Sequence, residues 1–176
     1  MTYTNTPPLA DLISQMAQGS TEALSQFYTA THSAVYAFAL SLLSDSHHAE
    51  DVMQETYIRA YHGAAGYTHM EKPMAWLMTI TKNLAFMKLR ERKDRYEELP
   101  EGLSYGGFEG HSLQRLDLQR ALDRLGGEER EIVVLHAVAG LKHREIAALL
   151  GMPLPTVLSK YHRALSKLRT YLKGEG

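Results

Sequence analysis

The last third of the chain, residues 128–172, constrains the fold most, because two helix-stop signals separate three helical patterns. Apolar residues recur at helical spacing in "EEREIVVLHAVAG", "LKHREIAALLG" and "MPLPTVLSKYHRALSKLRTYL". Gly151 stands where a helix C-terminus favours a left-handed residue. Pro153 and Pro155 fall in a following first turn, where a missing N–H costs nothing. The sequence therefore predicts a helix, then a short helix, a glycine turn and a longer helix.

The helices on either side of the short one each have an apolar face. The residues predicted to point inward are Ile132, Leu135, Val138 and Ala139 in the first helix, and Val157, Tyr161, Ala164, Leu168 and Leu172 in the last. The opposite face of the last helix carries Thr156, Ser159, Lys160, His162, Arg163 and Lys167. This arrangement is typical of a helix-turn-helix, whose second helix enters the DNA major groove. A helical hairpin whose charges only meet water is the alternative interpretation.

Charge is distributed unevenly along the 176 residues, although the net charge is only −1. Residues 1–95 hold 8 Lys/Arg against 9 Asp/Glu, residues 96–112 hold none against 4, and residues 113–176 hold 11 against 7. The apolar periodicity also stops in the middle segment, which is rich in Gly and Glu. We therefore predict two small helical domains, residues 1–95 and 113–176, joined by a flexible acidic linker at residues 96–112.

Helical spacing also dominates the N-terminal part, and no alternating strand pattern appears, so we predict an all-α fold. The expected helices run from Leu9 to Gly19, from Ser20 or Thr21 to the "SDSHH" break, from Ala49 to Gly63 and from Pro73 to Lys93. The chain has no cysteine, no signal-peptide pattern and no apolar run long enough to cross a bilayer. We expect a soluble, cytoplasmic protein with no membrane insertion.

Two N-terminal segments are expected to present surfaces that suit macromolecular partners. The helix "AEDVMQETYIRAY" exposes a mixed charged and apolar face, which suits docking on a protein. The segment "MAWLMTITKNLAFMKLRERKDR" combines basic side chains, which neutralise phosphates, with aromatic ones, which stack on unpaired bases. The alternatives are a solvated charge run in the first segment, and a core tryptophan with a solvated basic helix end in the second.

These segments resemble a known family. "HAEDVMQETYIRAY" followed by "PMAWLMTITKNLAFMKLR" looks like region 2 of the extracytoplasmic-function group of bacterial sigma-70 factors. "LDRLGGEEREIVVLHAVAGLKHREIAALLGMPLPTVLSKYHRALSKLR" looks like their region 4, and the resemblance extends from about Leu9 to Leu172. It implies an alternative sigma factor that binds core RNA polymerase and directs it to specific promoters for transcription initiation. Region 2 would then be residues 1–95 and region 4 residues 113–176.

The resemblance also implies partners for individual residues. The β′ clamp helices of the polymerase would contact Asp51, Gln54, Glu55, Ile58 and Arg59. The −10 element of promoter DNA would contact Trp76, Lys82, Asn83, Phe86, Arg90 and Lys93. The −35 element would contact Thr156, Leu158, Ser159, Lys160, His162 and Arg163. The polymerase β flap and an anti-sigma factor are further expected partners.

Four residues depart from the family pattern. Leu158 replaces a usual basic residue on the recognition helix, and Leu165 stands where arginine is frequent. Pro155 precedes Thr-Val where the family commonly has glycine, and Met87 stands where an acidic or amide residue is common. Leu158 either contacts a thymine methyl group or packs on protein. The promoter sequence is therefore not predicted.

Other functions fit the residues less well. His47, His48, Glu50 and Asp51 form a His/carboxylate cluster, but His47 and His48 are adjacent and cannot share one helix face. No phosphate-binding glycine loop or nucleophile motif appears. We therefore expect no enzymatic activity, no catalytic residue, no metal and no cofactor. The alternatives are a helix-turn-helix regulator that binds duplex DNA without joining the polymerase, and a structural helical adaptor.

Overall fold

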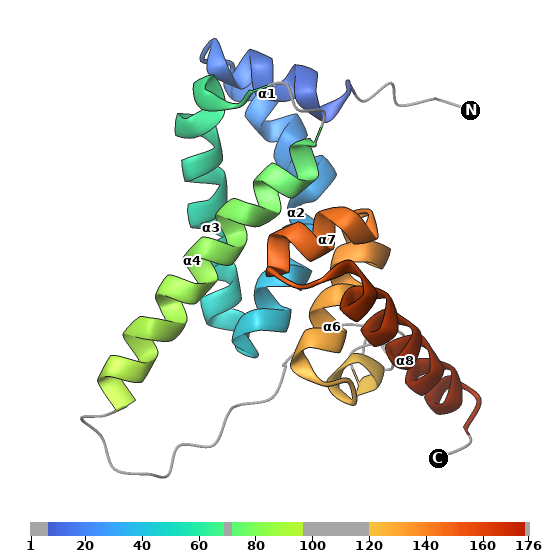
Figure 1. Cartoon of the computed structure of the whole chain (residues 1–176). Helices are drawn as coiled ribbons and strands as arrows, with labels where there is room; N and C mark the ends of the chain where they lie inside the picture. Colours follow the sequence, from blue (N-terminus) through green and yellow to red (C-terminus); the bar gives the residue numbers. More distant parts are fainter. Residues whose placement is uncertain (1–6, 69–71, 97–119, 175–176) are drawn as a thin grey trace.

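The computed structural model describes residues 7–68, 72–96 and 120–174, and within these ranges the chain is helical with no strand (Figure 1). The all-α prediction is confirmed. Of the predicted linker, residues 97–112 lie outside the described residues.

The N-terminal domain is built from four α-helices and one short 3-10 turn. They are α1 (Leu9–Ala17), α2 (Thr21–Leu43), α3 (Ser46–Gly63), the 3-10 turn η1 (Ala64–Gly66) and α4 (Pro73–Tyr96). Helices α2, α3 and α4 pack against one another, and α1 lies across one end of α2 (Figure 1).

Side-chain caps fix two of these helix starts. The Ser20 hydroxyl accepts a hydrogen bond from the Ala23 N–H at 3.1 Å and so begins α2, as the sequence predicts. Asp45 accepts from the His48 N–H at 2.9 Å and begins α3 at Ser46. The sequence places this start near Ala49, because it treats the polar residues as a break; the aspartate cap makes them the first turn instead.

Apolar side chains from all these helices meet in the domain interior, where Phe27, Phe38 and Leu77 are fully buried. A polar pair lies among them, since the Thr31 and Tyr57 hydroxyl oxygens are 2.7 Å apart. Buried hydroxyl groups are costly unless they find a partner, so this pair fixes how α2 and α3 pack together.

The C-terminal domain is the predicted helix-turn-helix with an additional helix before it. Residues 120–123 are helical, followed by α6 (Gly127–Val133), the π-helical turn η2 (Val134–Val138), α7 (His143–Leu150) and α8 (Leu154–Leu172). Gly151 has φ +65°, which confirms the predicted left-handed end of the short helix, and Pro153 is the N-cap of α8. Ile132, Ile146 and Val157 close the core between these helices.

Two residues predicted to point inward are exposed instead. Val138 is 48% exposed because the Ala139 N–H donates to the carbonyl of Val134, five residues back, and this π turn rotates Val138 outward. Ala139 occupies the interior in its place at 7% exposure. Leu172 is 67% exposed because it ends α8, beyond Leu168, which still packs on the domain core.

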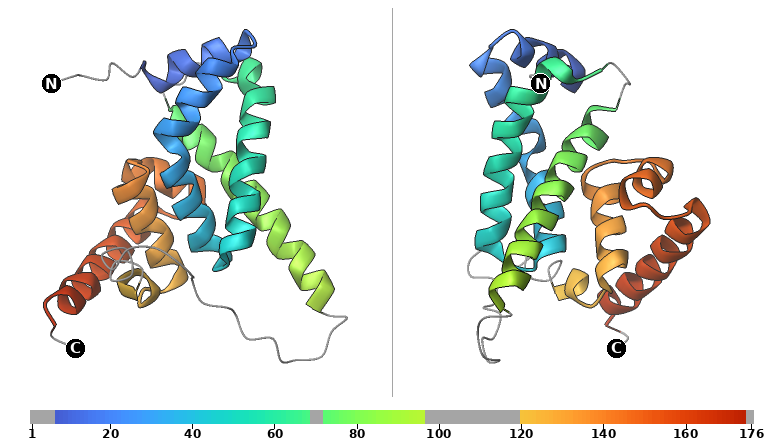
Figure 2. Two further views of the ribbon diagram at one scale, coloured as in Figure 1. Left: turned by 180° about the vertical axis from the view of Figure 1, so that it is seen from behind. Right: turned by 60° about the vertical axis from the view of Figure 1, so that its left-hand side comes forward.

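The two domains lie against each other (Figure 2). Helix α2 contacts α6 and η2, and α4 contacts α7. Buried apolar side chains from both domains belong to one continuous cluster. Within the three described ranges, no helix has the length and hydropathy of a membrane span.

Candidate nucleic-acid interface

The outer face of α3 carries the residues expected to dock on a protein. Asp51, Gln54, Ile58 and Arg59 are exposed, and Ile58 is 53% exposed although it is apolar. The Arg59 Nε donates to Glu55 Oε1 at 2.9 Å. Because exposed ion pairs add little stability, this pair remains available to a partner.

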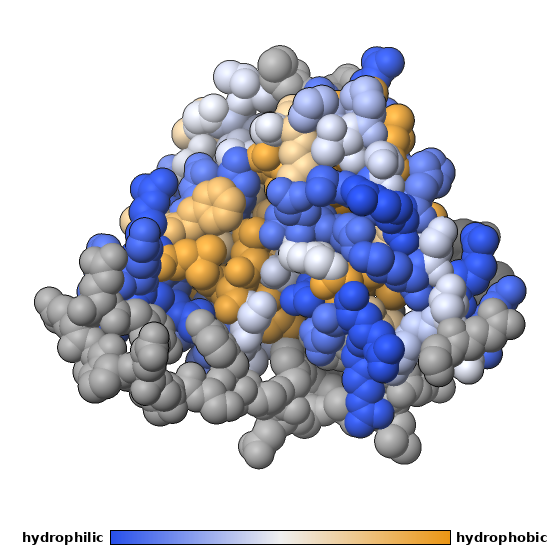
Figure 3. Space-filling view, turned by 60° about the horizontal axis from the view of Figure 1, so that its bottom comes forward, coloured by the Kyte–Doolittle hydropathy of each residue, from blue (hydrophilic) through white to orange (hydrophobic). Residues whose placement is uncertain are grey.

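The outer face of α4 exposes four of the six residues expected to contact the −10 element: Asn83, Phe86, Arg90 and Lys93. Trp76 is half-buried, packs on the apolar core and lies 5.2 Å from the Tyr67 ring between centroids. Phe86 and the neighbouring Met87 are 40% and 45% exposed. Figure 3 shows apolar surface bordered by hydrophilic residues on the underside of the molecule.

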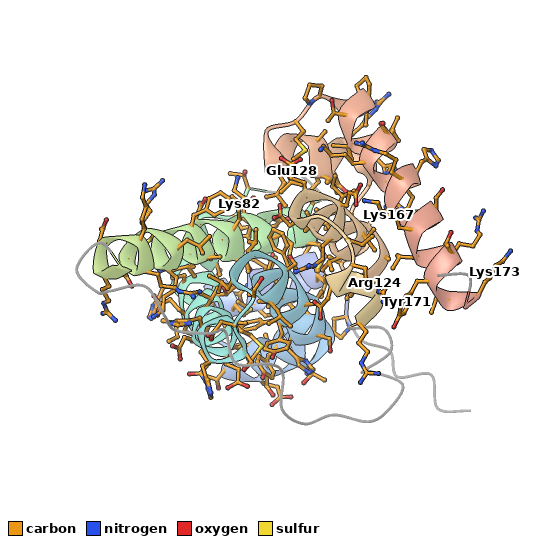
Figure 4. All side chains as sticks on the ribbon, turned by 90° about the horizontal axis from the view of Figure 1, so that it is seen from below. Lys82, Arg124, Glu128, Lys167, Tyr171 and Lys173 are labelled. Carbon is orange, nitrogen blue, oxygen red and sulfur yellow. The ribbon has the colours of Figure 1, made fainter. Side chains whose placement is uncertain are left out.

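Lys82, which the resemblance assigns to the −10 element, is less exposed than its neighbours Asn83 and Phe86. It is half-buried between the domains, where its Nζ donates to the carbonyl oxygen of Leu149 in α7 at 2.6 Å. The view from below shows Lys82 on the side of α4 that borders the C-terminal domain (Figure 4). This placement follows from the packing of the two domains, about which helical periodicity within one segment gives no information.

The outer face of α8 exposes Leu158, Ser159, His162 and Arg163, whereas Thr156 and Lys160 are half-buried. The Lys160 Nζ lies 2.6 Å from Glu128 Oε2. Farther along the helix, the Lys167 Nζ donates to Glu129 Oε2 at 2.7 Å. Both lysines of α8 are therefore paired with carboxylates from the first turn of α6.

Glu129 anchors this pairing. Its side chain is buried and also accepts from the Gly126 N–H at 3.3 Å, which caps α6. The hydrogen bond from Lys167 and the one from the Gly126 N–H hold the pKa of Glu129 below its ordinary value, against the effect of burial. Glu129 was not among the residues predicted from the sequence, although a glutamate three residues into a helix is a known capping signal.

An aromatic cluster joins the two helices of the helix-turn-helix. The His143 ring lies 4.3 Å from that of His136 and 4.7 Å from that of Tyr161, and His162 borders the cluster through Tyr161. Burial, and then the nearby His136 and His162, lower the pKa of His143. The cluster therefore favours the neutral form of His143 and fixes the start of α7 on α8.

Among the described residues, no group of three or more His, Cys, Asp or Glu side chains is placed to hold a metal ion. His48, one of the four residues weighed as ligands, has its Nδ1 2.9 Å from Asp45 Oδ1, next to the α3 cap.

Comparison with known proteins identifies the family. The family described as Sigma-70 region 2 matches residues 27–95, and Sigma-70, region 4, matches residues 115–168. The ECF RNA polymerase sigma factor EcfG of Rhodopseudomonas palustris is 30% identical over 161 residues, which cover 89% of this chain and 88% of that protein. The chain belongs to the ECF sigma factors. The sigma factor SigE of Mycolicibacterium smegmatis is 39% identical to it over 147 residues, 78% of this sigma factor and 57% of that longer relative.

Two solved structures resemble most of this sigma factor. One is the sigma factor RpoE in complex with the anti-sigma factor NepR from Bartonella quintana, with a TM-score of 0.68 and 27% identity, covering 87% of this chain and 98% of that one. The other is CnrH in complex with the cytosolic domain of CnrY, with a TM-score of 0.64 and 26% identity, covering 95% and 98%. Both alignments extend over the N-terminal and the C-terminal domain.

Proposed function

We infer that this sigma factor binds core RNA polymerase and directs it to specific promoters. The observation that carries this inference is that a single chain matches both sigma-70 regions and exposes three separate faces, on α3, α4 and α8. One protein-docking face and two DNA-contacting faces are what a subunit needs if it is to bridge an enzyme and a promoter.

The proposed division of labour follows these faces. Residues 1–95 act as region 2: the α3 face, centred on Ile58, docks on the β′ clamp helices, and the α4 face binds the −10 element and helps to open it. Residues 113–176 act as region 4, which binds the −35 element through α8 and meets the β flap. Residues 96–112 connect the two. Unpaired bases and phosphates suit the exposed Phe86, Arg90 and Lys93 of α4.

The role of the sigma factor is binding and not catalysis, so the polymerase performs the chemistry in the cytoplasm and this subunit supplies promoter recognition. An anti-sigma factor is a proposed regulatory partner. Support comes from the exposed apolar side chains of α4, Phe86 and Met87, and from the complexes in which the two structural relatives were solved. Purification from uninduced cells tests it, since recovery without a stoichiometric inhibitor contradicts this partner.

The test of the function is run-off transcription with purified core polymerase on fragmented DNA of the source genome, with and without the sigma factor. Discrete transcripts that depend on the added protein are expected, and their start sites give both promoter elements. If the folded protein does not bind core polymerase, the remaining function is that of a duplex-binding helix-turn-helix regulator.

A further inference from the structure

The contact between Lys82 and Leu149 is chemically specific. In a continuing helix, the carbonyl of Leu149 would accept a hydrogen bond from the N–H of residue 153. Residue 153 is a proline and has no N–H, so the backbone that follows α7 cannot donate this hydrogen bond to the Leu149 carbonyl. The Lys82 ammonium supplies the missing donor at 2.6 Å.

The charge of the donor also suits the place where it binds. Leu149 lies in the last turn of α7, where the helix dipole is negative and a cation is favoured. A lysine of the N-terminal domain therefore caps the first helix of the helix-turn-helix in the C-terminal domain. The apolar contacts of α2 with α6 and η2 hold the two domains at the distance that this cap requires.

The same lysine lies within the surface proposed to bind the −10 element. Asn83 and Phe86, one and four residues farther along α4, are exposed, and the Lys82 Nζ lies 5.9 Å from the centre of the Phe86 ring. Helix α7 approaches α4 next to this surface, and its Leu149 carbonyl binds the half-buried ammonium group of Lys82. The Leu149 carbonyl takes one N–H of the ammonium group, and α7 lies beside it, so a nucleic-acid phosphate has less access to Lys82 in this arrangement than on a separated α4.

We propose that the packed arrangement is a self-masking state, in which Lys82 caps α7 until the domains separate and then becomes available to a phosphate of the promoter strand. This proposal rests on the proposed function, because the competing ligand is promoter DNA. It predicts that the free protein binds promoter DNA weakly, because part of the phosphate-binding charge of α4 is used inside the protein.

The first experiment measures the reactivity of individual lysine amines by reductive methylation and mass spectrometry, in three states of the full chain. Lys88 is the matched control, because it is also half-buried on α4 but its nearest anion, Asp51, belongs to its own domain. In the free chain, Lys82 should react roughly tenfold more slowly than Lys88, the effect of one hydrogen bond to a charged group. Bound to core polymerase without DNA, Lys82 should become reactive, and it should be protected again in the promoter complex.

The second experiment measures domain separation directly. The chain has no cysteine, so Ser25→Cys on α2 and Thr170→Cys on α8, both at exposed positions, accept a fluorescence donor and acceptor. Lys82→Met should raise the separated fraction of the free chain several-fold, and Lys88→Met should leave it unchanged. Equal separation in the two variants would overturn the proposal, and so would Lys82 reactivity equal to that of Lys88 in the free chain.

Failure of this proposal is distinguishable from failure of the proposed function. If the protein supports promoter-dependent transcription but Lys82 stays protected in the complex with core polymerase alone, the function holds and the masking is wrong. If the protein does not bind core polymerase at all, the function is wrong.

Discussion

Helices α4 and α8 both use lysines to bind acceptors outside their own helix, but the acceptors lie in different places. Lys82 of α4 binds a backbone carbonyl of the other domain, whereas Lys160 and Lys167 of α8 bind carboxylates within their own domain. Separation of the domains therefore changes the charge that α4 presents and leaves that of α8 as it is. The surface proposed for the −10 element therefore depends on the domain arrangement, and the one proposed for the −35 element depends on the folding of the C-terminal domain.

The largest expected effect tests whether the ion pairs between the lysines of α8 and the glutamates of α6 stabilise the folded C-terminal domain. Glu129→Ala removes a buried carboxylate that caps α6 and binds Lys167, so we expect a loss of about 2 kcal/mol in the unfolding free energy. Because the pKa of Glu129 is lowered in the folded protein, this contribution is present above its ordinary pKa and is lost as the pH falls through the folded value. Urea unfolding measures the loss.

Glu128→Ala is the matched control for this variant. Glu128 is more than half exposed and pairs with Lys160, so its removal should cost less than about 1 kcal/mol. Equal losses in the two variants would mean that the burial of Glu129 contributes nothing, and that the pairing on α8 is only a surface feature.

The next prediction concerns α6, which packs on α2. Burial, and then the charge of Glu128, raise the pKa of Glu131 to about 7, against the opposing effect of Arg130. The stability that the protonated carboxyl provides is full below its ordinary pKa of 4.5 and is lost as the pH rises through about 7.

Glu131→Gln should therefore raise the unfolding free energy at pH 8 by about 1 kcal/mol, well under the full value of the shift because the side chain is partly exposed. The gain should disappear at pH 4, where both proteins are neutral at this position. Thermal unfolding at the two pH values measures it. A gain of the same size at both values would show that the effect does not come from the charge.

A smaller effect tests the contact proposed between α8 and the −35 element. Leu158 is 36% exposed on the outer face of α8, beside Ser159 and His162. If it contacts a thymine methyl group, replacing that thymine with deoxyuridine should weaken holoenzyme binding about fourfold, the value of one buried methyl-sized group. Leu158→Ala should bind the two DNAs equally. If no thymine position discriminates in the unaltered protein, Leu158 packs on protein instead.

The smallest expected effect is at the far end of α8. The Arg124 guanidinium lies 4.7 Å from the centre of the Tyr171 ring, and both are labelled in Figure 4. Arg124→Ala should lower the unfolding free energy by about 0.5–1 kcal/mol, as for an exposed cation–π pair. Arg169→Ala, at an exposed position on the same helix, serves as the control. A change in domain separation in Arg124→Ala would contradict the independence of region 4 from the domain contact.

The sequence is sufficient to predict most of the fold, because local signals decide it. Gly151, Pro153 and Ser20 act within a few residues of their own positions, and the structure has the turn and the caps that they predict. Where a local signal was misjudged, as at Asp45, the error was only three residues at a helix end.

The arrangement of the two domains could not be predicted in the same way. The position of Lys82 depends on a helix 67 residues away in the chain, and helical spacing gives no information about that distance. The roles of Glu128 and Glu129 depend likewise on lysines more than 30 residues farther on. Contacts between segments that are distant in the chain decide which charged side chains are free to bind a partner.

The π turn at Val134–Val138 has a consequence for comparing this protein with its relatives. Such a turn accommodates one more residue than an α-helix does between the same two ends. A relative with an uninterrupted α-helix here would be one residue shorter between Val133 and Gly140, and its alignment to this chain requires a gap inside the helix. If that gap is placed in the following loop instead, each residue between the π turn and the start of α7 is aligned with the wrong residue of the relative.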